Sequence, residues 1–257
     1  MAIYVMTGGS SGIGASIRSQ ILDAGHEVFN IDYKGGDFEA DLTTDEGVAA
    51  SIKAVEEKYP EGIDVLVLNA GVGPTMPAEK IFALNFYASR ELAEGLRPLL
   101  KLKRGNCVMT VSNSITNQTV RLDWVDLLTS MRRKSRGLEL ARSLEPAQAP
   151  SAYASSKRAL ARYIRRASPS WATDGLRLNG VAPGNTTTPM TQNLTDAQRD
   201  SALLIPIPTR YGTREFLDAD EIASAINFLA SPAASGINGQ ILFVDGGIDA
   251  LMRSEVF

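Results

Sequence analysis

Apolar residues along this chain fall into two patterns that alternate from the first residues onward. Amphipathic stretches, with apolar residues every three or four positions, predict helices, most clearly at Gly12–Ala24 and at Asp220–Ala230. Strands followed by helices predict an α/β domain built on a parallel sheet with helices on both faces. Short apolar runs between the helices predict buried strands at Ala2–Met6, Glu27–Ile31, Val65–Asn69, Cys107–Val111, Leu176–Val181 and Gln240–Val244.

The 257 residues show no internal repeat, low-complexity tract or linker, so residues 1–257 are predicted to form a single domain. Apolar residues make up 44% and charged residues 21%, which suits a sizeable core. The formal charge is −3, and the only strongly basic segment is Arg132–Arg136. A nucleic acid or an anionic membrane is therefore not expected as a partner.

The chain has one cysteine, Cys107, and one histidine, His26. An internal disulfide is excluded, and neither a histidine-based triad nor a multi-ligand metal site is expected, so no metal is predicted. Cys107 lies inside an apolar run, which indicates buried packing. The first strand pattern begins at Ile3 and leaves no room for a signal peptide, and no apolar run approaches the ~18 residues of a membrane span. We expect a cytoplasmic protein.

A glycine-rich turn follows the first predicted strand and precedes the first helix. Glycines at this point let the backbone turn tightly and approach a phosphate, and the free amides of the helix N-terminus favour a pyrophosphate. An ordinary glycine-rich loop is the alternative. The residues predicted to contact a dinucleotide here are Thr7, Gly8, Ser10, Ser11, Gly12, Ile13 and Gly14.

Asp32 ends the second predicted strand, about 20 residues beyond the turn, where a carboxylate binds the adenosine ribose. A carboxylate there accepts a hydrogen bond from the 2′-hydroxyl and repels a 2′-phosphate, so NAD is favoured over NADP. Lys34 could partly offset that repulsion. The alternative is a solvated aspartate at a strand end.

Tyr153 and Lys157 lie four residues apart in a helical pattern, and their side chains therefore share one helix face. Lowering the pKa of a phenol from about 10 to about 7 takes roughly 4 kcal/mol. One ammonium about 4 Å away supplies roughly that amount at an effective dielectric near 20. Lys157 is predicted to make Tyr153 a usable proton acceptor; the alternative is an ordinary exposed helix pair.

The motifs Thr7-Gly-x-x-x-Gly12-x-Gly14, Asn69-Ala70-Gly71, Tyr153-x-x-x-Lys157 and Pro183-Gly184-x-x-x-Thr188 occur in that order. Together they resemble the short-chain dehydrogenase/reductase family over essentially the whole chain. The resemblance implies a Rossmann-type, doubly wound, seven-stranded parallel sheet with helices on both faces. It also implies an oxidoreductase that uses a nicotinamide cofactor.

Further site residues are implied by the resemblance alone. Asn85 matches the family's helix asparagine that anchors a proton-relay water, although a lone mid-helix asparagine more often has a structural partner. A serine after the fifth strand should steady the substrate oxygen, and Ser112 is preferred to Ser114. The remaining residues implied to border the cofactor are Asp41, Leu42, Asn69, Ala70, Gly71, Tyr153, Lys157, Pro183, Gly184, Thr186 and Thr188.

Within the family, the ending Val244–Arg253 and the long gap between Ser112 and Tyr153 resemble the bacterial 3α-hydroxysteroid dehydrogenase/carbonyl reductase group. The gap indicates an insertion over residues 119–149, whose apolar positions predict two short helices: Trp124, Leu127, Leu128 and Met131, then Leu138, Leu140, Ala141 and Leu144. Two short amphipathic helices cannot bury both stripes against each other, so a second subunit or the cleft rim should cover them. A contact in a homodimer or homotetramer is preferred to a lid.

Residues 186–210 read as a loop with several apolar residues, which suits a bulky apolar substrate such as a steroid or, equally, ordinary core packing. The sequence therefore predicts an NAD-dependent enzyme that interconverts a secondary alcohol and a ketone, with a hydroxysteroid as the first substrate to test. The alternatives are another cyclic or aromatic alcohol, a non-catalytic NAD-binding protein of this fold, and an enzyme such as a sugar epimerase that shares the Tyr-Lys pair.

Overall fold

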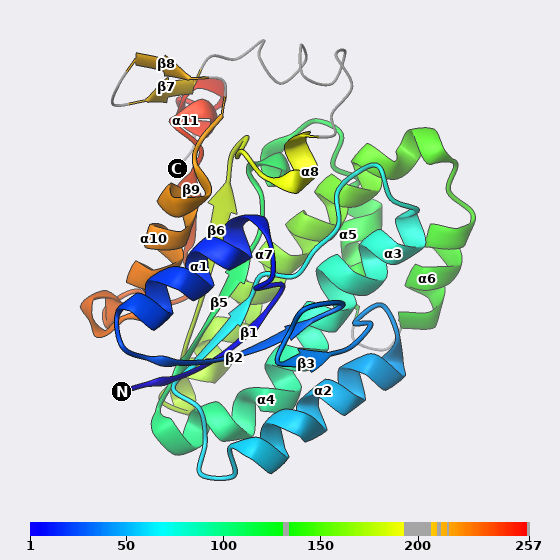
Figure 1. Cartoon of the computed structure of the whole chain (residues 1–257). Coiled ribbons are helices and arrows are strands. Elements are labelled where there is room, and N and C mark those ends of the chain that lie inside the picture. Colours follow the sequence, from blue (N-terminus) through cyan, green and yellow to red (C-terminus); the bar gives the residue numbers. More distant parts are fainter. Residues whose placement is uncertain (131–133, 193–206, 210–211, 215, 256–257) are drawn as a thin grey trace.

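Within the residues that the structure describes, seven strands form one parallel sheet in the order β3-β2-β1-β4-β5-β6-β9 (Figure 1). The structure is a computed structural model and describes residues 1–130, 134–192, 207–209, 212–214 and 216–255. The strand order reverses between β1 and β4, which leaves a crevice at their carboxyl ends, where α/β proteins bind ligands. The strands are β1 Ile3–Thr7, β2 Glu27–Asp32, β3 Phe38–Glu39, β4 Val65–Leu68, β5 Asn106–Thr110, β6 Arg177–Pro183 and β9 Ile241–Val244.

The predicted doubly wound sheet is confirmed, and each predicted strand is present with ends within two residues of those expected. The sequence missed β3, Phe38–Glu39, because two residues on a sheet edge leave no measurable periodicity. The segment 186–210, expected to be a loop, contains α8 (Pro189–Gln192) and β7 (Ile207–Thr209). β7 pairs with β8 (Gly212–Arg214) in a separate antiparallel ribbon. Leu203 and the rest of 193–206 lie outside the described residues.

Helices cover both faces of the sheet (Figure 1). Alternate residues of a strand point to opposite faces, so Tyr4 and Met6 of β1 join one core and Val5 the other. α1 (Gly12–Asp23) and α10 (Ala219–Ala230) contribute Ile17, Ile21, Ile222 and Ile226 to the first core. The second core is covered by α2 Asp45–Lys58, α4 Ser89–Lys103 and α7 Ala149–Thr173. The shorter elements are α3 Ala78–Phe82, a π-helical turn η1 Ala83–Ala88, the 3₁₀ turns η2 Asn113–Thr116, η3 Pro146–Gln148 and η4 Pro232–Ala234, and α11 Ile248–Met252.

The insertion forms the two predicted helices, α5 (Leu122–Thr129) and α6 (Lys134–Arg142). The expectation that their apolar stripes need a second subunit or the cleft rim is wrong, because α7 and α3 of the same chain cover them. Trp124 is buried edge-to-face on Phe82 of α3, with ring centroids 6.3 Å apart. The predicted stripe residue Met131 lies outside the described residues.

Ion pairs fix the insertion to the rest of the fold. The Lys134 ammonium lies 2.7 Å from a carboxylate oxygen of Glu91 in α4, and it also pairs with Asp45 at the start of α2. Arg142 lies 2.7 Å from Glu79 of α3. The insertion is therefore part of one packed unit with α2, α3 and α4. No helix among the described residues is both long and apolar enough to cross a membrane.

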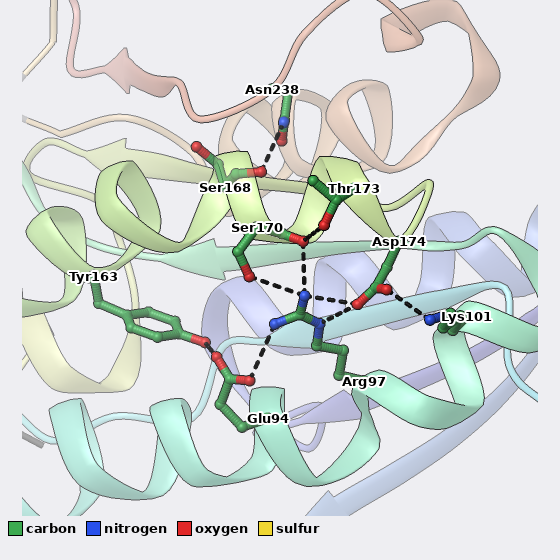
Figure 2. A network of polar contacts seen from close by, with 9 residues as sticks. All are labelled: Glu94, Arg97, Lys101, Tyr163, Ser168, Ser170, Thr173, Asp174 and Asn238. Atoms are coloured by element: carbon green, nitrogen blue, oxygen red, sulfur yellow. Dashed lines mark hydrogen bonds and ion pairs between the residues drawn. The ribbon is translucent and has the colours of Figure 1, made fainter.

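A polar network joins α4 to the far end of α7, the helix that contains Tyr153 and Lys157 (Figure 2). The Arg97 guanidinium donates to the Asp174 carboxylate at 2.7 and 3.0 Å and to the Ser170 carbonyl at 2.8 Å. It also lies 5.3 Å from the ring centre of Trp171. Lys101 completes the network with a contact of 2.6 Å to Asp174. Hydrogen bonds from Lys101 and Arg97 hold the pKa of Asp174 below its ordinary value.

We expect Arg97→Met to lower the midpoint of thermal unfolding by several degrees and Lys101→Met to lower it much less. Arg97 is only 20% exposed and joins three groups, whereas Lys101 is 59% exposed and forms a single surface pair. Thermal melts of both variants check this. Equal shifts would show that Arg97 is no more important to α7 than a surface charge.

Candidate active site

Side-chain hydrogen bonds join the carboxyl ends of β1, β4 and β5. The Thr7 hydroxyl oxygen accepts from the backbone N–H groups of Asn69 and Ala70 at 3.2 and 3.1 Å. The Asn69 amide nitrogen donates to the Gly8 carbonyl at 3.1 Å, and its oxygen accepts from the Thr110 hydroxyl at 2.9 Å. This network holds the two sides of the crevice at a fixed separation.

The glycine turn needs its glycines because other backbone atoms lie too close to leave room for a side chain. Gly8 has φ +72°, and a Cβ there would lie 2.8 Å from the Ala70 backbone. A Cβ on Gly14 would lie 1.8 Å from the Gly8 carbonyl oxygen. Ser11, the residue before α1, makes no capping bond with its side chain, so the first amides of the helix are left for a ligand.

Asp32 lies at the end of β2 and faces the same crevice. Its two carboxylate oxygens accept from the Ser10 and Tyr33 backbone N–H groups, at 3.0 and 2.7 Å. At the neighbouring strand end, hydrogen bonds from Thr43 hold the pKa of Asp41 below its ordinary value. The Asp41 carboxylate is therefore charged at neutral pH beside the predicted adenosine position.

A cleft of about 830 Å³ runs from Asp32 to Tyr153. The side chains of Thr188 and Pro189 lie close to Gly12, and the Met190 side chain lies close to Gly73. The start of α8 therefore covers part of this cleft. Predicted residues that line the cleft are Gly8, Ser11, Gly12, Ile13, Asp32, Asp41, Leu42, Asn69, Ala70, Gly71, Ser112, Tyr153, Lys157, Pro183, Gly184, Thr186 and Thr188.

Four predicted residues are not among those that line the cleft. Thr7 and Asn85 are buried behind it and bond to backbone, and Gly14 packs against the Gly8 carbonyl. Ser10 turns away, since its hydroxyl donates to the Gly35 carbonyl at 3.1 Å. Ser10 instead borders a neighbouring hollow with Arg18 and Lys34.

Ser112 and Tyr153 meet in the cleft. Burial raises the pKa of the Tyr153 phenol, and a hydrogen bond with the Ser112 side chain opposes that rise. The Ser112 oxygen accepts from the Ser114 backbone N–H at 3.2 Å. Of the two serines considered from sequence, Ser112 is therefore the one that contacts the phenol.

Lys157 is buried, with 4% of its surface exposed. Its ammonium donates to the Thr110 backbone carbonyl at 2.8 Å, and burial lowers its pKa to about 8. Lys157 was expected to lower the pKa of Tyr153. In the structure the pKa of that phenol is raised by burial and lowered by Ser112. The reason is that the lysine nitrogen is directed towards β5.

Asn85 has a structural partner. Its side-chain oxygen accepts from the Val72 backbone N–H at 2.9 Å, and its amide donates to the Val72 carbonyl at 3.0 Å. A Cβ on Gly71 would lie 3.1 Å from the Asn85 oxygen and 3.5 Å from the Lys157 nitrogen, so this loop separates the two side chains narrowly. Asn85 fixes the loop after β4, and its part in proton transfer stays a prediction.

Sequence reasoning missed several residues that line the cleft. Thr110 could have been predicted. It is the last residue of β5, β5 pairs with β4, and the carboxyl ends of neighbouring parallel strands lie together, which places Thr110 beside the Asn69 motif. Met190 and Thr191 belong to the loop 186–210 that the sequence analysis assigned to the substrate. The others carry no local signal and come together only in the fold: Tyr33, Ala40, Thr43, Val72, Pro74, Met76, Lys80, Leu84, Val111, Asn113, Asn117, Thr119, Pro150 and Ala154.

The fold and site define a dinucleotide-binding α/β protein with serine, tyrosine and lysine side chains at one end of the cleft. Residues 2–122 match the family model described as short chain dehydrogenase. Residues 131–249 match the model described as enoyl-(acyl carrier protein) reductase.

The chain is 34% identical to the 3-alpha-hydroxysteroid dehydrogenase/carbonyl reductase of Comamonas testosteroni, with 100% of both chains covered. It is 29% identical to the cis-4-hydroxycyclohexanecarboxylate dehydrogenase of Sinomonas cyclohexanicum over 97% of both. The crystal structure of the 3-alpha-hydroxysteroid dehydrogenase from Pseudomonas sp. B-0831 complexed with NADH is similar at a TM-score of 0.92, with 36% identity and 100% of both chains covered. The chain therefore belongs to the short-chain dehydrogenase/reductase family and is an oxidoreductase.

The residues present fit a nicotinamide dinucleotide. The glycine turn leaves no Cβ between the cleft and the first amides of α1, and Asp32 lies at the end of β2. Lys157 uses one N–H for Thr110 and keeps two donors for ribose hydroxyls. These groups are spread along one cleft, as an extended dinucleotide requires.

The buried ammonium gives a pH prediction. The pKa of Lys157 falls from 10.5 to about 8 on folding, so folding disfavours the charged form, and stability should rise as pH rises from about 8 towards 10.5. Lys157→Met removes this contribution. Relative to Lys157→Met, the unmodified protein should gain about 2 kcal/mol of unfolding free energy between pH 7 and pH 9.5. Urea unfolding of both proteins across that range measures the gain, and a constant difference would contradict the assigned pKa.

Proposed function

We propose that this protein is an NAD-dependent dehydrogenase that interconverts a secondary alcohol and a ketone, with hydroxysteroids as the first substrate class. The observation that carries the proposal is that Ser112, Tyr153 and the buried Lys157, one helical turn from Tyr153, line the same end of the cleft that begins at the glycine turn. The names of the Comamonas testosteroni and Pseudomonas relatives support hydroxysteroids.

Asp32 supports NAD as the cofactor. Its carboxylate lines the cleft and accepts hydrogen bonds from two backbone N–H groups. The remaining lone pairs of the two carboxylate oxygens are available to a cofactor hydroxyl. Such a group accepts from a ribose hydroxyl and repels a phosphate. The Pseudomonas structure with NADH is consistent with this choice.

The protein's own residues handle the proton. The Ser114 backbone N–H occupies one lone pair of the Ser112 oxygen, so the Ser112 hydroxyl proton is free to point at the phenol oxygen or at the substrate oxygen. Donation to the phenolate stabilises the charged form of Tyr153, which then accepts the alcohol proton. The reverse path gives that proton to a ketone. A bound nicotinamide supplies the hydride chemistry.

Lys157 supplies positive charge. With a pKa of about 8, its amine is mostly protonated at neutral pH. Because the ammonium is buried, its charge is weakly screened by solvent, and its two remaining N–H groups are available to bind ribose hydroxyls.

Assembly and location belong to the proposal as well. We infer a homodimer or homotetramer, supported by the exposed apolar side chains of Phe228, Leu242, Leu251 and Met252 on α10, β9 and α11. We infer a cytoplasmic location, which suits a chain whose one cysteine, Cys107, is a buried free thiol.

Tyr153→Phe should lower kcat by roughly 10²–10⁴-fold and leave NADH binding intact, because it removes only the proton-carrying oxygen. Tyr163→Phe is the matched control, since that phenol lies on the same helix and bonds to Glu94 outside the cleft. Formation of reduced nicotinamide with 3α-, 3β-, 7- and 17-hydroxysteroids and with simple cyclic alcohols measures turnover. Retained turnover in Tyr153→Phe would refute the role of the phenol.

Asp32→Asn should narrow the preference for NAD over NADP by roughly tenfold, because it removes the charge that repels a 2′-phosphate. Lys34→Ala should widen the same preference, since it removes a nearby cation that favours the phosphate. Ratios of kcat/KM for the two cofactors check both variants. If neither ratio moves, cofactor choice is made by other residues.

A further inference from the structure

The Lys157 ammonium is held in place by one neutral group. It is buried, and within the described part of the chain its only hydrogen-bond partner is the Thr110 backbone carbonyl, at 2.8 Å. A lysine side chain is a flexible stem with a compact charge at its end, so it adopts the direction that its partner imposes. The position of the Thr110 carbonyl therefore decides where the two remaining N–H groups of Lys157 point.

Thr110 lies where the main-chain pairing of β5 ends on one side. Towards β6, Thr110 pairs with Val181, and the N–H of the next residue, Val111, donates to the Val181 carbonyl at 2.7 Å. Towards β4, the last pair of the described ladder is Leu68 with Met109, one residue before Thr110. The main chain therefore fixes Thr110 to β6 and leaves its β4 side to another contact.

A side-chain hydrogen bond supplies that contact. The Thr110 hydroxyl donates to the side-chain oxygen of Asn69 at 2.9 Å, and Asn69 is the residue directly after β4. Among the described residues, Thr110 is the only donor to this oxygen. The hydroxyl therefore joins the end of β5, whose carbonyl holds the ammonium, to the end of β4.

Asn69 is itself fixed to the glycine turn. Its side-chain amide donates to the Gly8 carbonyl at 3.1 Å, and its backbone N–H donates to the Thr7 hydroxyl oxygen at 3.2 Å. Hydrogen bonds are directional, so each of these contacts restricts the orientation of the next group. A continuous series of hydrogen bonds thus runs from Gly8 through Asn69 and Thr110 to Lys157.

We propose that Thr110 is a positioning residue for the cofactor: its hydroxyl, bound to Asn69, fixes the strand end whose carbonyl orients the Lys157 ammonium towards the ribose of a nicotinamide dinucleotide. This inference rests on the proposed function, because it concerns the same cofactor site. Thr110 acts through Lys157 and not on the reacting atoms.

The hydroxyl, and not the carbonyl, makes the residue type matter. Every residue supplies a carbonyl at this point, whereas valine has nearly the shape of threonine and supplies no hydroxyl. Thr110 is buried, so its replacement by valine leaves the Asn69 oxygen without its donor. An unpaired buried oxygen is costly, and the strand end shifts to relieve that cost. Serine keeps the hydroxyl and should preserve the contact.

NADH binding measures the effect without any turnover. Thr110→Val should raise the Kd of NADH by roughly tenfold, because Lys157 no longer presents its N–H groups to the ribose hydroxyls. Thr110→Ser should stay within about twofold of the unmodified protein, since the hydrogen bond to Asn69 is retained. Titration of each protein with NADH, followed by nicotinamide fluorescence, gives the Kd.

Two more variants guard the comparison. Thr110→Ala removes the hydroxyl without a branched side chain and should raise the Kd as Thr110→Val does, so the test does not depend on the folding of one variant. Thr129→Val is the matched control, because the Thr129 hydroxyl bonds to the Val125 carbonyl on α5 at 2.8 Å and does not line the cleft. Its Kd should be unchanged.

A double-mutant cycle separates positioning from direct contact with the cofactor, which is the rival explanation because Thr110 itself lines the cleft. In a Lys157→Met background, Thr110→Val should change the Kd of NADH by less than about twofold, since no ammonium is left to orient. A tenfold rise in that background as well would overturn the positioning role and assign a direct contact to Thr110.

The outcomes separate this inference from the proposed function. An unchanged Kd in both Thr110→Val and Thr110→Ala overturns the inference and leaves the proposed function standing. The expected cycle, combined with no oxidation of any alcohol in the screen, supports the link from Thr110 to Lys157 and refutes the proposed enzyme. Absence of NADH binding by the unmodified protein refutes both.

Discussion

The hydrogen bond from the buried Lys157 ammonium to the Thr110 carbonyl is the contact on which the site depends. It places a cation behind the cleft, where solvent screens it weakly. Burial opposes that charge and lowers the lysine pKa to about 8, so the fold holds the ammonium at a cost in stability. The two elements that hold it are β5, through the carbonyl, and α7, through the side chain.

Thr110 also connects this cation to the dinucleotide turn. Its carbonyl accepts from Lys157, and its hydroxyl donates to Asn69, whose amide in turn bonds to Gly8. A displacement of β5 would therefore disturb the glycine turn and α7 together. At the other end of α7, Arg97 fixes the helix to α4, so Tyr153 and Lys157 project from a helix held at both ends (Figure 2).

The sheet and the main motifs could be predicted because both depend on residues that are close together in the sequence. The spacing of apolar residues predicts the strands and helices, and the turn glycines and the spacing of Tyr153 and Lys157 mark the motifs. What failed depended on partners far along the chain. The stripe containing Trp124 is covered by α3 and α7, which no local pattern shows. Lys157 is directed towards Thr110, 47 residues earlier, so spacing on one helix did not reveal which group sets the pKa of Tyr153.

The turn after β5 holds the Ser112 side chain through its main chain. The group that orients the Ser112 hydroxyl is the backbone N–H of Ser114, which every residue except proline provides. Asn113 and Ser114 are among the residues that line the cleft, and their side chains take no part in that hydrogen bond. Replacement of either side chain therefore leaves the backbone donor to Ser112 in place.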